Sequence, residues 1–296
     1  MKKINKIFVV SVIASCCLLT FAFVPIYKLS YDTNYVQISS ANYKGDKFTT
    51  VNMTRSGDRV KAKYFAATDN NGKSVYSSYL EWSKNKNIIL LCGAAYFCQF
   101  NNEYKPCGLT IDNGILVNEK ISERGNGLAI VYATGGIACS NIKEGNLSIK
   151  CNSGDKKLNI KDAWDLKEFI KCAQEQKATV FQQHLLVYRD QLNDFTGIKE
   201  TPEKRRFLVV GKDFEDKFVH TIVDCPKETP LKVGAEKAFN FLKEFRDMKE
   251  IIFMLNLDTG SQNVFQLFDK NGNIRNDITG IVKPEDAVNL LVYYYE

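Results

Sequence analysis

The chain has 296 residues, of which 45% are hydrophobic and 25% are charged, and 40 Lys and Arg against 34 Asp and Glu give a net charge of +6. This is the composition of an ordinary globular domain. The positive charge is spread along the chain without a run of like charges, so we do not expect a nucleic acid as partner.

The N-terminus carries the features of an export signal. Three lysines lie within the first six residues, and an uncharged apolar stretch at 7–27 follows them. Positive charge before about 20 apolar residues keeps the N-terminus cytoplasmic, and such a stretch is long enough to cross a bilayer as a helix. We therefore predict that 1–27 is a signal anchor or signal peptide, with membrane attachment through 7–27 and the rest of the chain extracytoplasmic, in the cell envelope.

A lipoprotein signal is the alternative. Ile13-Ala14-Ser15-Cys16 resembles a lipobox, in which the cysteine, here Cys16, accepts the lipid. The chain stays apolar beyond this cysteine as far as Pro25, which favours the anchor over the lipoprotein.

Beyond the apolar stretch, the sequence predicts a linker or edge segment at 28–58 and one domain at 59–296. Seven of the nine cysteines lie outside the apolar stretch, and no pair of them has the C-x-x-C spacing of a zinc or redox site. The two histidines, His184 and His220, are too few and too isolated for a His-based metal cluster. We expect no metal and no cofactor, and the oligomeric state stays open.

Short apolar runs separated by Gly and Asn predict strands along the domain. These runs are at 60–67, 88–92, 109–117, 128–132, 180–188, 207–210, 218–223, 251–257, 264–268 and 288–294. The dipeptide Asn113-Gly114 predicts a tight hairpin turn. A second hairpin is expected at 138–151 about Glu144-Gly145, in one of two registers; one of them places Cys139 opposite Cys151.

Two amphipathic helices are predicted, from about residue 162 to 176 and from about 233 to 246. Many strands with two substantial helices predict an α+β fold, with a mixed, largely antiparallel sheet in a single domain behind the N-terminal segment.

The strand at 251–257 leads into Asp258-Thr259-Gly260-Ser261, which looks like the motif around an aspartic-protease carboxylate. That chemistry needs two carboxylates that share one proton. The chain has no second D-T-G or D-S-G, and only 36 residues follow Gly260. We therefore rank an aspartic protease third, behind the two functions described in the next paragraphs.

Several segments in their order along the chain resemble the phosphodiester glycosidase domain, the family of the "uncovering" enzyme that removes N-acetylglucosamine from a sugar phosphodiester. They are Ile88–Phe97 with its Gly93-Ala94-Ala95-Tyr96-Phe97, Pro106–Leu109, Asp112–Gly114, Phe181–Val187, Arg206–Gly211, Asn256–Ser261 and Asn289–Tyr293. The resemblance covers about 60–295. It departs from the family where Ala94, Ala95 and Thr259 replace glycines and Leu185 replaces a proline.

The resemblance implies hydrolysis of a glycosyl phosphodiester in envelope or extracellular glycans. Asp258 would act as general acid or base, and Arg206 would neutralise the phosphate. The expected substrate-binding residues are Asn256, Gln182, Tyr96, Gly93, Thr259, Gly260 and Ser261. The alternatives are that Asp258 only caps its own turn, that Arg206 is a solvated surface residue, and that Tyr96 packs in the core. The alternative function is a non-catalytic domain that binds a glycan or a protein in the envelope.

Overall fold

The computed structural model describes residues 35–296 except 56–58, 67–72, 101–102, 197, 199–200 and 246–247. The apolar stretch at 7–27 and Cys16 lie outside the described residues, so the predicted anchor and lipidation site lie there too. In the described part of the chain, no helix is long and apolar enough to cross a membrane.

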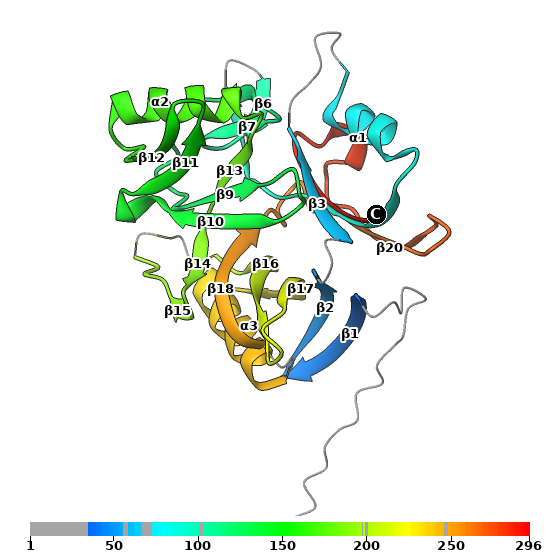
Figure 1. The fold of residues 1–296 in the computed structure, drawn as a ribbon. Helices are drawn as coiled ribbons and strands as arrows, with labels where there is room; N and C mark the ends of the chain where they lie inside the picture. Colours follow the sequence, from blue (N-terminus) through cyan, green and yellow to red (C-terminus); the bar gives the residue numbers. More distant parts are fainter. Residues whose placement is uncertain are drawn as a thin grey trace, which may run out of the picture.

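Three larger sheets build the domain, and every strand pair in the described part is antiparallel (Figure 1). The seven-stranded sheet has the order β1 (Val36–Tyr43), β2 (Asp46–Thr54), β17 (Phe218–Thr229), β16 (Glu203–Asp213), β18 (Met248–Leu257), β14 (Leu185–Tyr188) and β15 (Gln191–Leu192). One five-stranded sheet has the order β10 (Ile137–Asn141), β9 (Gly127–Val131), β13 (Thr179–Gln183), β7 (Thr110–Asp112) and β8 (Ile115–Asn118). The other has the order β20 (Ile274–Ile278), β19 (Phe265–Phe268), β4 (Asn87–Cys92), β21 (Leu290–Tyr295) and β3 (Val60–Phe65).

Two short ribbons complete the strands. They are β5 (Phe97–Phe100) with β6 (Glu103–Pro106), and β11 (Leu147–Cys151) with β12 (Gly154–Leu158). The helices are α1 (Val75–Ser83), α2 (Ala163–Glu175) and α3 (Leu231–Phe245), with short 3-10 turns η2 (Ile142–Glu144) and η3 (Pro284–Asp286). The predicted α+β class is confirmed, and α2 and α3 begin and end within two residues of their predicted limits.

The sequence prediction missed α1. Its apolar residues Val75, Tyr79 and Trp82 have helical spacing, and the Ser74 hydroxyl caps it by accepting from the Ser77 N–H. The helix has only nine residues and is rich in serine and aromatic residues, which are weak helix formers. Its packing on the sheet that contains β4 and β21 therefore stabilises it more than its own propensity does.

The three sheets share one central core, and each has a helix on its outer face (Figure 1). Strand alternation produces this arrangement: Leu208 of β16 faces the shared core, while its neighbours Phe207 and Val209 pack against α3. Phe241 of α3 is fully buried on that face, and burying a side chain of this size contributes about 1.5–3 kcal/mol.

The hairpin about Asn113-Gly114 is confirmed, because β7 pairs with β8 and both turn residues have positive φ, 49° and 80°. The hairpin expected about Glu144-Gly145 is wrong. Its first half, β10, pairs with β9, and its second half, β11, pairs with β12 instead. The residues before Gly145 form the 3-10 turn η2. Gly145 ends this turn in the left-handed conformation, with φ 69°. Pairing with more distant strands therefore overrides the local turn signal.

The described residues contain two disulfides, Cys98–Cys107 and Cys151–Cys172. The second ties β11 to α2, so Cys151 does not pair with Cys139, as one register of the rejected hairpin would have it. Cys92, Cys139 and Cys225 are free thiols.

The segment at 28–58, for which the sequence predicts a linker or an edge segment, contains β1 and β2 in its described part. β2 pairs with β17 along six residues, and β1 is the outer strand of the seven-stranded sheet.

Candidate functional site

A cleft of about 700 Å³ opens where the end of β18, the break between β13 and β14, and the loop after β4 meet. Two of the sequence-predicted residues that precede the last motif block, Tyr96 and Gln182, line this cleft. Asn256, the first residue of the last block, reaches it through its contact with Tyr96. From the last block, Asp258, Gly260 and Ser261 line it. Segments far apart in the sequence therefore meet at one place.

Asp258 is the central acid of the cleft. It follows β18 directly, is only 3% exposed, and accepts one hydrogen bond at Oδ1 from the Gly260 N–H at 3.0 Å. Its Oδ2 is buried with no hydrogen-bond partner among the described residues. Burial raises the pKa of Asp258 from 3.8 to about 6, with a further contribution from Glu203, while the Gly260 N–H and Arg206 act in the opposite direction. Asp258 therefore does cap its own turn, as the alternative interpretation of the sequence had it. The cap satisfies only one of the two carboxylate oxygens.

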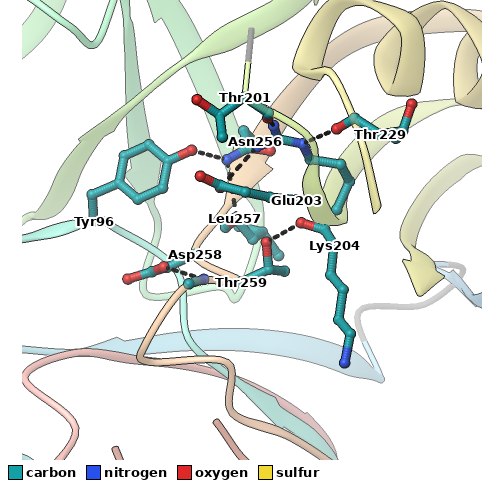
Figure 2. A network of polar contacts seen from close by, with 11 residues as sticks. Tyr96, Thr201, Glu203, Lys204, Thr229, Asn256, Leu257, Asp258 and Thr259 are labelled. Carbon is teal, nitrogen blue, oxygen red and sulfur yellow. Dashed lines mark hydrogen bonds and ion pairs between the residues drawn. The ribbon is translucent and has the colours of Figure 1, made fainter. Parts of the chain in front are cut away.

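Asn256 and Tyr96 form a second polar group beside Asp258. Figure 2 shows the Tyr96 ring directed at Asn256, whose Nδ2 donates to the tyrosine hydroxyl and, at 3.1 Å, to the Leu257 carbonyl. Because the Tyr96 oxygen accepts from Asn256, its own proton is available to a ligand in the cleft. Burial raises the pKa of Tyr96 well above its usual range, so the hydroxyl keeps that proton at physiological pH.

His184 lies against Tyr96, with the two rings in an edge-to-face arrangement at 5.7 Å between centroids. Its Nδ1 is buried and has no hydrogen-bond partner in the described part of the chain. Burial lowers the pKa of His184 to about 4, and the nearby Arg124 and Arg205 cations add to this effect. The imidazole is therefore neutral at pH 7 and can accept or donate a hydrogen bond.

The loop at 93–96 is held in place by Asn289. The Asn289 Oδ1 accepts from the N–H groups of Ala94 and Ala95, and its Nδ2 donates to the Ala95 carbonyl at 2.8 Å. Gly93 packs so closely that an added Cβ would lie 2.8 Å from the Gln262 carbonyl oxygen. Gly93 does not itself line the cleft. Its lack of a side chain allows the loop at 93–96 to pack closely against the backbone at Gln262.

The residues that stand where the resemblance would place glycines do not obstruct this backbone. Ala94, Ala95 and Thr259 all have negative φ, so none of these positions needs a glycine for its conformation. The Thr259 hydroxyl turns away from the cleft and donates to the Lys204 carbonyl (Figure 2). Thr259 thus fixes the turn, while Gly260 and Ser261 face the cleft.

Gln182 borders the cleft but its amide is fully used within the protein. Its Oε1 accepts from the N–H groups of Leu109 and Ser122, and its Nε2 donates to the carbonyls of Ser122 and Gly125. Gln182 therefore positions the loop at 119–126, which forms one wall of the cleft.

Arg206 does not reach the cleft, and it is not a solvated surface residue either. Its side chain is 1% exposed, donates from Nε to Asp224 at 2.9 Å and from Nη1 to the Val264 carbonyl at 3.0 Å, and lies over the Phe265 ring. In β16, Arg206 projects to the shared core, whereas Arg205 projects to the opposite face. The guanidinium expected beside a phosphate thus forms a buried ion pair.

The cleft residues that were not predicted from the sequence include His184, Arg205, Glu203, Arg124 and Lys143. Arg205 is 4% exposed and is held by the carbonyls of Thr229 and Thr201 and by the Glu203 carboxylate. One sequence feature could have indicated that His184 lies in the cleft. This residue directly follows the Gln182-Gln183 pair and precedes a strand. Arg124 lies in the loop at 119–126 and Glu203 is the first residue of β16, and the sequence has no comparable signal for either position.

The cleft thus combines a carboxyl group that titrates near neutral pH, a neutral imidazole, a tyrosine hydroxyl and the cations Arg124, Arg205 and Lys143. The described residues contain no group of three or more His, Cys, Asp or Glu that could hold a metal ion. Such a set can transfer protons and bind an anionic, hydroxyl-rich ligand.

No protein-family model and no curated protein sequence matches this chain. Among solved structures, similar folds include the auto-inhibited catalytic domain of zebrafish N-acetylglucosamine-1-phosphodiester α-N-acetylglucosaminidase, at 15% identity, covering 88% of this chain and 82% of that one, with a TM-score of 0.49. A hypothetical protein from Synechocystis is 12% identical over 88% of this chain and 62% of that one, with a TM-score of 0.45. A Burkholderia pseudomallei protein named as exported is 9% identical over 88% and 75%, with a TM-score of 0.46. The structural neighbours of this chain thus include a glycosidase domain and an exported protein.

Proposed function

We propose that this chain is an extracytoplasmic hydrolase that cleaves a glycosyl phosphodiester in the cleft about Asp258. The observation that carries the proposal is the Asp258 carboxyl group, which lines the cleft with one unpartnered oxygen and a pKa raised to about 6. A carboxyl group with a pKa near the working pH is suited to proton transfer. The substrate class comes from the sequence resemblance, of which the segments with Tyr96, Gln182 and Asp258 line the cleft.

In the proposed reaction, water attacks the anomeric carbon of the sugar and its proton passes to the Asp258 carboxylate. The bond between that carbon and the phosphate oxygen breaks, and the phosphate monoester leaves with the bonding electron pair. Asp258 is ionised above pH 6, so it can accept this proton at neutral pH. The phosphate monoester is a stable anion and needs little help from an acid.

The remaining cleft residues fit the two ends of such a substrate. Arg124 and Lys143 offset the negative charge of the phosphodiester, whereas Arg205 already pairs with the Glu203 carboxylate. The Tyr96 hydroxyl and the neutral His184 imidazole are available to sugar hydroxyls, since neither ring is committed to a charged partner. Asn256 fixes the orientation of Tyr96.

The extracytoplasmic location rests on the apolar stretch at 7–27 and gains support from the two disulfides. Disulfides form and persist mainly in oxidising compartments outside the cytoplasm. The Cys98–Cys107 disulfide borders the cleft.

The test is hydrolysis of a panel of glycosyl phosphodiesters with short alcohols by a purified chain that begins at residue 28. All described helices and strands lie between Val36 and Tyr295, so this chain contains the whole described fold. Released reducing sugar is measured. We expect Asp258→Asn to lower kcat at least about a hundredfold, because it removes the proton acceptor.

Asp155→Asn is the matched control, since Asp155 is an exposed residue of β12 outside the cleft. Equal rates for Asp258→Asn and the wild type would refute the role of Asp258. Binding of the panel without release of sugar would favour the non-catalytic glycan-binding domain, and peptide cleavage blocked by a pepstatin-type inhibitor would favour the aspartic protease.

A further inference from the structure

A second depression, of about 900 Å³, lies next to the cleft, between the loop at 119–126, η2 and the beginning of α2. We call it the side groove. Its apolar residues are Ile121, Ile142, Ile160, Leu166 and Ile170. Ile142 and Ile160 are buried, and the other three are partly exposed within the groove, so its floor is an apolar surface that the described chain leaves uncovered.

Lysines surround this apolar floor. Lys120, Lys143, Lys161 and Lys167 line the side groove, against two acidic residues, Glu119 and Glu123. None of the four lysines forms a close ion pair with a carboxylate in the described part of the chain: Lys120 and Lys167 lie over the rings of Phe100 and Trp164, and the Lys143 charge acts on Asp194. Exposed cations without acidic partners attract an anion, and their stems extend the apolar surface.

The side groove adjoins the cleft and shares part of its lining. Ser122, Glu123, Gly125, Asn126 and Lys143 line both, so the loop at 119–126 forms the seam between them. The amide of Gln182 bonds Ser122 and Gly125, and so holds this seam in position. A ligand whose phosphate lies near Lys143 can therefore extend into both depressions.

We propose that the side groove holds the apolar chain of a lipid alcohol, and that the substrate is a sugar joined to this lipid through a phosphodiester. The inference rests on the proposed function, since the sugar and phosphate occupy the cleft. The lysines and the apolar floor match a phosphate followed by a hydrocarbon chain.

The test measures binding of octyl phosphate and decyl phosphate to the chain beginning at residue 28, by calorimetry below their micelle concentrations. Each buried methylene raises affinity about fourfold, so two further methylenes raise it about fifteenfold if the groove buries them. We expect Leu166→Gln to remove this dependence on chain length. Ile121→Gln, in the loop, serves as a second variant in case the change in α2 impairs folding.

Two further variants separate the contribution of the lysine charge to binding from that of the hydrocarbon chain of the ligand. Lys143→Gln, at a position that lines both depressions, weakens binding of both phosphates by a similar factor, because it removes a charge beside the phosphate. Lys157→Gln, at an exposed position of β12 outside the side groove, leaves both affinities unchanged.

Equal affinities for the two alkyl phosphates would overturn the inference, and so would wild-type binding by both Leu166→Gln and Ile121→Gln. Binding to anionic vesicles alone would assign the lysines to a membrane surface and also overturn it. These measurements need no turnover. Hydrolysis of short-chain substrates without chain-length-dependent binding would leave the proposed function standing and remove only the lipid.

Discussion

Replacing Asp258 with Asn should stabilise the folded protein at neutral pH while it abolishes hydrolysis. The folded-state pKa of Asp258 is about 6, against an ordinary value of 3.8. The difference, at about 1.4 kcal/mol for each pH unit, corresponds to about 3 kcal/mol. Folding disfavours the ionised form, so the wild type has its full stability below pH 4 and loses about this amount as the pH rises through 6.

Asparagine is a close match to the protonated acid. Its Oδ1 can still accept from the Gly260 N–H, and its second polar atom occupies the position of Oδ2, which has no partner in the described part of the chain. The difference in unfolding free energy between Asp258→Asn and the wild type should therefore be near zero at pH 4 and reach about 3 kcal/mol in favour of the variant at pH 7.5.

Urea denaturation of both proteins at a series of pH values measures this difference directly. Other groups that titrate, such as His184 and His220, affect both proteins alike and cancel in the comparison. Parallel stability curves across pH 4–7.5 would show that burial does not raise the pKa of Asp258, and would remove the main support for its role in proton transfer. A stabilised but inactive variant is the expected signature of a functional residue placed at a cost to stability.

Two further variants test the framework of the site. Arg206→Met should lower the unfolding free energy by about 3–5 kcal/mol, because it leaves the buried Asp224 carboxylate unpaired. The double variant with Asp224→Asn should lose less stability. Urea denaturation measures both losses, and no loss in the single variant would contradict the ion pair. Asn289→Ala should lower the unfolding free energy by about 3 kcal/mol and raise KM for the glycosyl phosphodiester. The reason is that the buried N–H groups of Ala94 and Ala95 lose their hydrogen-bond acceptor. Unchanged stability and kinetics would show that Asn289 does not support the loop at 93–96.

Local sequence signals determined the elements whose causes are local. Asn113-Gly114 specifies its own hairpin because both residues tolerate positive φ. The apolar stripes of α2 and α3 specify their helices, and Asn256 and Asp258 lie on one side of the chain because strand residues alternate. The motif order along the chain also pointed to Tyr96 and Asp258, which the cleft brings together.

Only the tertiary structure decided what depends on register and on distant pairing. Arg206 pairs across the sheet with Leu257, so its side chain lies on the face opposite Asn256 and Asp258, whereas Arg205 lies on theirs. A shift of one residue exchanges the two faces of a strand, and no local pattern in Lys204-Arg205-Arg206 distinguishes them. For the same reason the partners of Cys151 and the place of His184 in the cleft follow from which strands meet, because that choice is made by packing across the whole core.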